Sequence, residues 1–291
     1  MSVRDIAVNK KREIVSISQE SSVKEALQLL SKNNILSAPV YDGEKCVGLV
    51  DVLDLTTFVT NVYFTSNKES QFKNYLVQFS FELEKVSSVM NFSQRNPYVP
   101  VSLDTPLNDV LSKFAGGVHR VPVLEGEKVT FLLTQTALLA ELEASSAFQS
   151  IKDKTISELK VGVQGSLQSV SDSSITIDAF KLISDSGVSA VAVKSATGKV
   201  VGALSASDLQ GFIGEELFHL GSNVVDFLTF ARKKKNDDRD NMVHIKAQDT
   251  LGTAVTRILS TRVHRLFIVD EKLEVVGLLT LTDVFKIIND Q

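Results

Sequence analysis

Residues 262–285, RVHRLFIVDEKLEVVGLLTLTDVF, decide the fold of this chain. Two runs rich in apolar and β-branched residues, 266–270 and 275–279, flank a charged turn and predict a β-hairpin. Thr282 and Asp283 follow the hairpin. They predict a helix start there, because short polar side chains satisfy the unpaired N–H groups of a first helical turn.

The residues before this stretch complete one structural unit. Residues 242–245 predict a short strand, and residues 250–259 carry apolar positions at helical spacing, so the unit has the order β-α-β-β-α. The same order is predicted three more times upstream, and such recurrence indicates a repeat protein. The hairpins align on Gly48, Phe131, Gly202 and Gly277, which are spaced 71 to 83 residues apart. The first four elements are predicted at 14–17, 22–34, 38–42 and 47–50 in the first repeat, at 98–101, 105–114, 119–123 and 129–134 in the second, and at 167–170, 175–187, 189–193 and 200–204 in the third.

The most specific stretches of the four repeats are LSKNNILSAPVYD (30–42), GGVHRVPVLEGEKV (116–129), SGVSAVAVKSATGKVVGALSASDL (186–209) and the 262–285 stretch. They resemble the CBS domain family, whose copies pair into Bateman modules. The resemblance implies an α/β (α+β) fold with two such modules in a disc-like arrangement. The first module would span residues 1–147, with repeats at about 12–62 and 86–143, and the second 148–291, with repeats at about 152–214 and 225–290.

A narrower resemblance rests on the His-Arg pairs of the second and fourth repeats, the Ser-Ala pair of the third, and the bridging stretch KTISELKVG (154–162). These features are similar to the gamma regulatory subunits of AMP-activated protein kinase and their plant and protist relatives. The resemblance implies a non-catalytic subunit whose ligands are AMP, ADP and ATP. Its implied partners are a serine/threonine kinase catalytic (alpha) subunit and a scaffolding beta subunit.

Composition narrows the class of protein. The chain has 291 residues with 43% hydrophobic content, which predicts a globular fold. A net charge of −4 leaves no basic footprint for nucleic acid or an anionic membrane, so neither partner is expected. The single cysteine, Cys46, excludes an intrachain disulfide and suits a reducing compartment.

The N-terminus lacks the apolar core of a signal peptide, so a cytoplasmic location is expected. The basic run at 232–235, read as a solvated loop, leaves a nuclear location as a second option.

Motifs for catalysis are missing from the sequence. The four histidines show no HExxH or paired spacing, and there is no Gly-rich phosphate loop and no GxSxG turn. We therefore expect no enzymatic activity, no metal and no cofactor.

The third and fourth repeats carry a pattern suited to a nucleotide. Both contain Ser/Thr-x-Ser/Thr-Asp, at 205–208 and 280–283. A carboxylate at a helix start accepts ribose hydroxyls, and hydroxyl groups beside a helix N-terminus favour phosphate. The candidate ligand residues are Ser205, Ser207, Asp208, Thr280, Thr282 and Asp283. The alternative is that these side chains only cap their helices.

Positive charge for phosphate is available at two equivalent places. His119-Arg120 and His264-Arg265 each put a guanidinium beside an imidazole. If the two halves pack about a pseudo-twofold axis, as the family resemblance implies, these pairs approach one another and share phosphates. The alternative is a surface pair at the entry of each strand.

The other two repeats depart from the pattern. Ala137 stands where the second repeat should carry the ribose carboxylate, so an empty position is expected there. The first repeat keeps Asp54 but has Asp51 in place of the hydroxyl, and a second carboxylate repels phosphate. Leu36 replaces the arginine of animal gamma subunits. Asp54 is therefore the weakest candidate.

Two alternative functions remain open. One is a constitutive CBS scaffold of a kinase complex without nucleotide response, favoured by the departures in the first two repeats. The other is a stand-alone CBS regulator of an unrelated enzyme. The aromatic residues between the first two repeats, at 64–81, are read as core, with a partner-binding face as the alternative.

Overall fold

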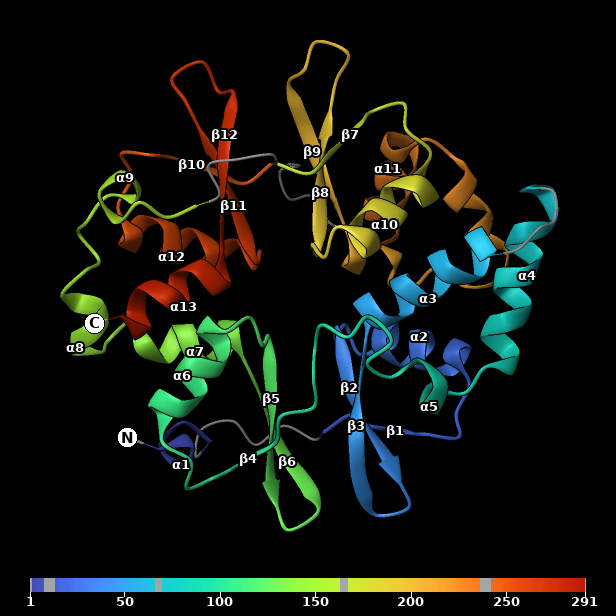
Figure 1. The fold of residues 1–291 in the computed structure, drawn as a ribbon, viewed down its shortest axis with the longest axis horizontal. Helices are drawn as coiled ribbons and strands as arrows, with labels where there is room; N and C mark the ends of the chain where they lie inside the picture. The colour runs from blue at the N-terminus through green and yellow to red at the C-terminus, as the bar shows by residue number, and fades with distance from the viewer. Residues whose placement is uncertain (1, 8–13, 66–69, 163–166, 236–241, 291) are drawn as a thin grey trace. The chain divides into compact units, whose positions relative to one another are not determined.

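The computed structural model describes residues 2–7, 14–65, 70–162, 167–235 and 242–290, and describes side chains in these ranges except at 7, 70–76 and 235. The chain forms two compact units that do not follow chain order. The first unit contains residues 1–14, 99–167 and 239–291, and the second contains 15–98 and 168–238. The second and fourth repeats thus share the first unit, and the first and third repeats share the second (Figure 1). The predicted module boundary at 147–148 lies inside the first unit, and the division into two Bateman modules stays a prediction.

Each repeat contains one three-stranded sheet, as the sequence predicts. Its first strand pairs in parallel with the second across a helix, and the second and third strands form an antiparallel hairpin. Each hairpin also contains a register shift. The strands are β1 (Ile17–Ser18), β2 (Ser37–Asp42) and β3 (Lys45–Asp51); β4 (Val101–Ser102), β5 (Arg120–Glu125) and β6 (Lys128–Thr134); β7 (Ser169–Ser171), β8 (Ala190–Lys194) and β9 (Val200–Ser205); β10 (His244–Lys246), β11 (Arg265–Val269) and β12 (Val275–Thr280).

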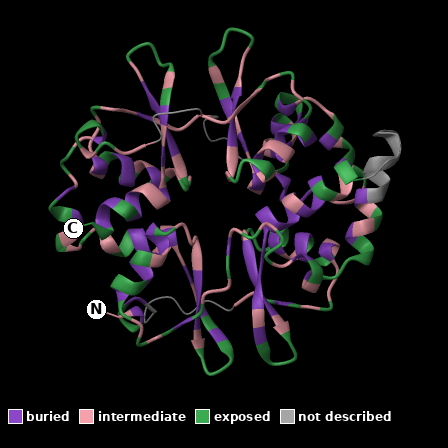
Figure 2. Ribbon diagram, viewed as in Figure 1, coloured by how far each residue is buried: buried purple, intermediate pink, exposed green. Residues whose placement is uncertain are grey.

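The second unit is built around helices α2 (Val23–Lys32), α3 (Val52–Thr65) and α10 (Thr176–Asp185). A capping box starts α2: Ser22 Oγ accepts the N–H of Glu25 at 3.2 Å, and Glu25 Oε2 accepts the N–H of Ser22 at 2.7 Å. Helices α3 and α10 pack on each other, and one apolar core joins the two repeats (Figure 2).

The first unit repeats this plan with α6 (Leu107–Ala115), α7 (Gln135–Leu142), α12 (Leu251–Thr261) and α13 (Leu281–Asn289). Helices α6 and α13 make the most extensive helix contact of the unit, and Figure 1 shows them side by side. The fully buried rings of Phe114 and Phe285 meet edge to face there, with centroids 5.2 Å apart.

A short helix before each repeat attaches to a different repeat within the same unit. Helix α1 (Val3–Ala7) donates backbone hydrogen bonds to the segment before α6, and α5 (Val86–Val89) donates them to the segment before α2. In the same way α9 (Ile156–Leu159) bonds the segment before α12, and α11 (Val224–Lys235) the segment before α10. The bonds are backbone N–H to C=O contacts of 2.8 to 3.0 Å, such as Val86 N to Ser21 O and Val224 N to Ser174 O.

The third repeat differs from the prediction after its hairpin. The predicted second helix is a single 3₁₀ turn, η1 (Ala206–Leu209), and a second 3₁₀ segment, η2 (Gly214–Gly221), follows. Gly211 has a φ of +87°, and an added Cβ would lie 2.9 Å from Ser31 Oγ. The chain therefore turns away at Gly211 before a helix can continue.

The structure also bears on the basic run at 232–235 and on the aromatic residues at 64–81. The basic run lies at the end of α11 and is not a loop, so that expectation was wrong. Lys234 pairs with Glu216 and lies 5.6 Å from the centroid of the Phe212 ring. In the aromatic stretch, Phe81 is buried as core and Phe79 is 60% exposed, while the side chains of Phe72 and Tyr75 lie outside those described.

Across the described ranges, no helix has the length and apolar character needed to cross a membrane.

We expect Phe285→Ala to lower the free energy of unfolding by about 3 to 5 kcal/mol, because the cavity would lie between α6 and α13. Urea denaturation of the full chain measures this loss. Val276→Ala, at a side chain 50% exposed on β12, is the matched control and should stay within about 0.5 kcal/mol. A loss for Phe285→Ala no larger than that of the control would contradict the assignment.

Candidate functional site

One backbone hydrogen bond marks the same place in all four repeats. The carbonyl of the residue before the hairpin accepts the N–H of the residue that opens the following helix. The donor and acceptor pairs are Val52 and Leu36 at 3.0 Å, and Gln135 and His119, Ala206 and Ser189, and Leu281 and His264, each at 3.1 Å. Leu36, His119, Ser189 and His264 are therefore structurally equivalent, as the sequence alignment predicts.

The residues that face each other at the end of each hairpin are equally well defined. Arg120 is the cross-strand partner of Thr134, and Arg265 is the partner of Thr280. In the third repeat Ala190 faces Ser205. Both His-Arg pairs lie in the first compact unit, together with Asp283. Asp208 lies in the second unit, so the candidate residues divide into two groups.

The fourth repeat holds its aspartate in a capping box. Thr280 donates through its N–H and its hydroxyl to Asp283 Oδ2, at 2.9 and 2.7 Å, and Thr280 Oγ1 accepts the N–H of Asp283 at 3.2 Å. No described residue donates a hydrogen bond to Asp283 Oδ1. The capping interpretation is thus confirmed, and one carboxylate oxygen of a half-buried residue remains available to a ligand.

The third repeat has the same arrangement with serines. The N–H and hydroxyl of Ser205 donate to Asp208 Oδ2 at 2.8 and 2.9 Å, and the hydroxyls of Ser205 and Ser207 lie 2.6 Å apart. Three polar side chains therefore gather at the start of η1. Their role in binding a ligand stays a prediction.

The second repeat contains a buried polar residue, Gln135, that the sequence did not single out. Thr134 Oγ1 caps α7 by accepting the N–H of Ala137 at 3.2 Å, so a cap remains although the aspartate is missing. Gln135 is buried, and its Nε2 donates to Phe114 O at 3.3 Å and to Thr282 Oγ1 at 3.1 Å. Thr282, a predicted phosphate ligand, is thus oriented by the neighbouring repeat. The sequence does contain a signal for Gln135: it is an amide at the position where the third and fourth repeats carry the apolar residues Ala206 and Leu281.

The first repeat buries two carboxylates at its hairpin end. Asp51 and Asp54 are 2% and 1% exposed. Asp51 Oδ1 accepts the N–H of Asp54 at 2.9 Å, so Asp51 takes the place of the capping hydroxyl. Burial raises the pKa of Asp54 to about 7, and the like charge of Asp51 adds to that shift, while hydrogen bonds from Ser93 oppose it.

A segment between α5 and β4 covers these carboxylates. Asp54 Oδ1 accepts the N–H and the hydroxyl of Ser93 at 2.9 and 2.6 Å, and Asp54 Oδ2 accepts the N–H of Asn91 at 3.2 Å. The amide of Asn96 donates to Asp51 Oδ2. The carboxylate predicted to bind ribose is therefore already bound by residues 91–96, which the sequence did not assign to any site.

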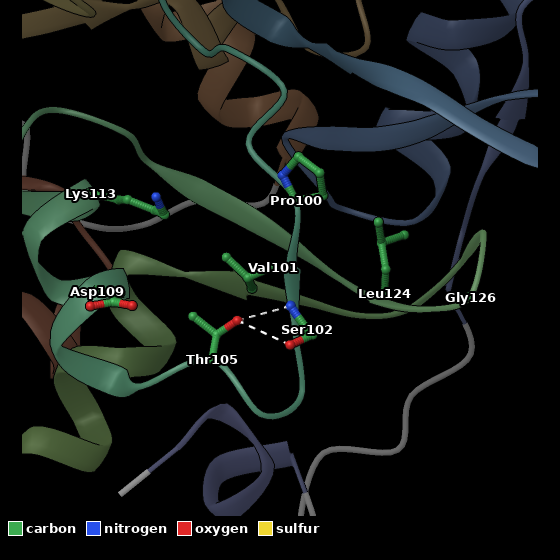
Figure 3. A pocket seen from close by; sticks show the side chains of 8 residues that line it. All are labelled: Pro100, Val101, Ser102, Thr105, Asp109, Lys113, Leu124 and Gly126. Atoms are coloured by element: carbon green, nitrogen blue, oxygen red, sulfur yellow. Dashed lines mark hydrogen bonds between the residues drawn. The ribbon is translucent and has the colours of Figure 1, made fainter.

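One hollow of the surface lies away from all these residues. It has a volume of about 530 Å³ and is lined in the second repeat by Pro100, Val101, Ser102, Thr105, Asp109, Lys113, Leu124 and Gly126. Figure 3 shows Asp109 and Lys113 at one side of it and the hydrogen-bonded Ser102 and Thr105 at another. None of the predicted site residues lines it.

We expect stability to fall by roughly 2 kcal/mol between pH 5 and pH 7 on account of Asp54. Its folded pKa of about 7 exceeds the ordinary value of 3.8, so the folded state keeps a proton in this window that the unfolded state has lost. Urea denaturation at pH 5, 6 and 7 measures the trend. Asp51→Thr, which restores the hydroxyl of the other repeats, should make the fall smaller. An unchanged pH dependence in this variant would contradict the role of the Asp51 charge.

Comparison with known proteins places these repeats in a family. The CBS domain model matches residues 3–61, 86–143 and 238–290. The third repeat lies outside these matches but has the strand order and pairing of the other three.

Two curated relatives show the narrower likeness. Protein SDS23 of Candida albicans is 24% identical over 88% of this chain and 46% of its own. The 5'-AMP-activated protein kinase subunit gamma-3 of Sus scrofa is 26% identical over 91% of this chain and 51% of its own. The chain thus spans about half the length of these relatives.

A solved structure from Methanocaldococcus jannaschii, of a protein suggested to be an archaeal homologue of g-AMPK, agrees in fold. Its TM-score is 0.76 at 19% identity, over 98% of this chain and 99% of that one. The predicted fold class and the resemblance to gamma subunits are confirmed. Since the family model matches more than half of its residues, the chain belongs to the CBS domain family.

Proposed function

We propose that this chain is a non-catalytic regulatory subunit that binds AMP, ADP or ATP at its third and fourth repeats within a kinase complex. The observation that carries the proposal is the capped Ser/Thr-x-Ser/Thr-Asp turn, which recurs with the same hydrogen bonds around Asp208 and Asp283. Similarity to a gamma subunit over 91% of the chain supports it.

The chemistry of the fourth repeat suits a nucleotide. Asp283 Oδ1 lies beside the first turn of α13, where it can accept a ribose hydroxyl. The N-terminus of the nine-residue helix favours anionic phosphate, and Arg265 lies directly across the strand pair from Thr280. His264 adds an imidazole that can donate a hydrogen bond to a phosphate oxygen.

Only two of the four repeats are proposed to bind. In the second repeat Ala137 supplies no carboxylate and Gln135 fills the buried position beside it. In the first repeat Asp54 is occupied by Asn91 and Ser93. A phosphate would also meet the second negative charge of Asp51 there.

Regulation would follow from the number of phosphates. AMP and ATP share the adenosine contacts, so only the phosphate contacts at His119, Arg120, His264 and Arg265 distinguish them. A ligand shifts a conformational equilibrium only through such differential contacts. The proposed partners are a kinase catalytic (alpha) subunit and a scaffolding beta subunit, and the proposed location is the cytoplasm, with the nucleus as the second option.

A second candidate function is a constitutive scaffold of a kinase complex. The internally bonded Asp54 of the first repeat and the missing carboxylate at Ala137 of the second repeat favour it. In a reconstituted complex it would leave kinase activity unchanged by AMP and ATP, whereas the regulatory proposal requires the two nucleotides to act differently.

We expect Asp208→Ala and Asp283→Ala each to weaken AMP binding about tenfold or more, because each removes a charged hydrogen-bond acceptor for the ribose. Titration calorimetry of the full chain measures this loss. Glu25→Ala, which removes the same capping interaction from α2, is the matched control and should bind as the wild type does. Wild-type affinity in both aspartate variants, or no binding by the folded wild type, would sink the ribose assignment.

We expect Arg265→Ala to weaken ATP binding more than AMP binding, since a guanidinium at the phosphate position interacts with each added charge. Competition between the two nucleotides, followed by calorimetry, gives the ratio of their affinities. Arg4→Ala, which removes an exposed ion pair with Asp104, is the control. An unchanged ratio in Arg265→Ala would remove this residue from the phosphate contacts.

A further inference from the structure

Residues 90–96, here called the strap, run across the hairpin end of the first repeat. The strap supplies four hydrogen-bond donors to two buried carboxylates, and the N–H groups of Asp51 and Asp54 themselves supply two more. The four strap donors belong to Asn91, Ser93 and Asn96, and three of them bond Asp54, the residue equivalent to Asp208 and Asp283. The contacts thus replace those of an external ligand.

Further contacts hold the two ends of the strap. An added Cβ on Gly48 of β3 would lie 2.9 Å from Met90 Sδ, so Met90 rests directly on that strand. The Phe92 ring meets Phe58 of α3 edge to face at 5.8 Å. Arg95 Nη1 donates to Val188 O of the third repeat at 2.8 Å.

The backbone of the strap is strained at one residue while it holds this shape. Gln94 has a φ of +55°, in the left-handed region that residues other than glycine and asparagine rarely adopt, and Asn91, with a φ of +57°, tolerates that region. Strained residues persist only where the surrounding contacts over-determine them. The hydrogen bonds to Asp54 are such contacts, so the strap should open when the cost of burying the carboxylate pair exceeds what they contribute.

Charge at the carboxylate pair is not balanced by the groups that face it. Asp51 on β3 and Asp54 on α3 lie side by side, and Arg95 of the strap faces Asp51. Burial lowers the pKa of Arg95, and the charge of Asp51 opposes that shift. With both carboxylates ionised, one cation opposes two buried anions, which is costly in a protein interior.

A hydrogen-bond acceptor also lies beside the Asp51 and Asp54 pair. Asn96 is 6% exposed and its Oδ1 atom accepts no hydrogen bond from any described residue, although its amide nitrogen donates to Asp51. A half-turn of this amide would let Oδ1 accept a hydrogen bond from a proton shared by the carboxyl pair. The buried site therefore contains a hydrogen-bond acceptor for a carboxyl proton as well as donors for ionised carboxylates.

We propose that the strap is an autoinhibitory segment that occupies the first repeat in place of a ligand, and that it is held most tightly while the Asp51 and Asp54 pair carries a proton. Loss of that proton leaves two adjacent charges and favours the open strap. The proposal rests on the proposed function only in treating the covered position as a ligand position. Its test needs no nucleotide.

The sign of the effect follows from linkage. In the open strap Asp54 is solvated and ionises near its ordinary pKa of 3.8, whereas under the strap its pKa is about 7. The opening equilibrium therefore rises roughly 50-fold between pH 5 and pH 7, and it levels off above pH 7.

Amide hydrogen exchange of the full chain tests this directly. After division by the intrinsic exchange rate at each pH, the protection of the Asn91 and Ser93 amides should fall about 30-fold or more from pH 5 to pH 7. The Val40 amide, on the core strand β2, is the internal reference and should remain better protected. In Asp51→Thr the fall should be smaller and should end at a lower pH.

Two results would overturn the proposal. One is protection of the Asn91 and Ser93 amides that does not change between pH 5 and pH 7 in the wild type. The other is equal protection at Val40, which would mean that the whole unit opens and the strap does not open by itself. If Asp51→Thr does not fold, the carboxyl ¹³C shift of Asp54 in the wild type decides. A midpoint near pH 7 supports the proton-held strap, and a midpoint near pH 4 rules it out.

Discussion

The passage from hairpin to helix is the constraint on which each repeat depends. A helix leaves its first N–H groups without intrahelical partners, and here they must be satisfied at the edge of a small sheet. One of them always bonds the carbonyl before the hairpin, as Leu281 N bonds His264 O. The N–H two residues further on is capped by a side chain at the last hairpin position, and the four repeats fill that position with Asp51, Thr134, Ser205 and Thr280.

The choice of capping residue decides what each repeat can do. A hydroxyl cap followed by an aspartate, as at Thr280 and Asp283, uses one carboxylate oxygen for the helix and leaves the other for a ligand. A hydroxyl cap without the aspartate, as at Thr134, leaves no carboxylate for a ligand. A carboxylate cap at Asp51 creates a buried pair of like charges, which the strap covers. The same turn therefore supports a candidate binding site in one repeat, a cap alone in another and an internally bonded carboxylate pair in a third.

Packing within each unit depends on contacts between repeats distant in sequence. Phe114 and Phe285 join the second and fourth repeats, and Gln210 Nε2 of the third repeat donates to Leu30 O and Ile35 O of the first at 2.8 Å. Because Thr282 is oriented by Gln135, a change in the second repeat would reach the fourth. Coupling of this kind is what a regulatory module requires, and it is carried by ordinary hydrogen bonds and buried rings.

The sequence by itself determined the four repeats, their strand and helix order, and the equivalence of His119 with His264, because apolar periodicity and turn residues act over a few positions. It also singled out Asp208 and Asp283 and placed Asp51 beside Asp54. Only the tertiary structure decided which repeats share a core, that Gly211 ends the second helix of the third repeat, that Gln135 bonds Phe114 and Thr282, and that the strap covers Asp54. These outcomes arise from contacts between residues about 20 to 180 positions apart, such as Phe114 with Gln135 and Leu30 with Gln210, and no local pattern encodes such contacts.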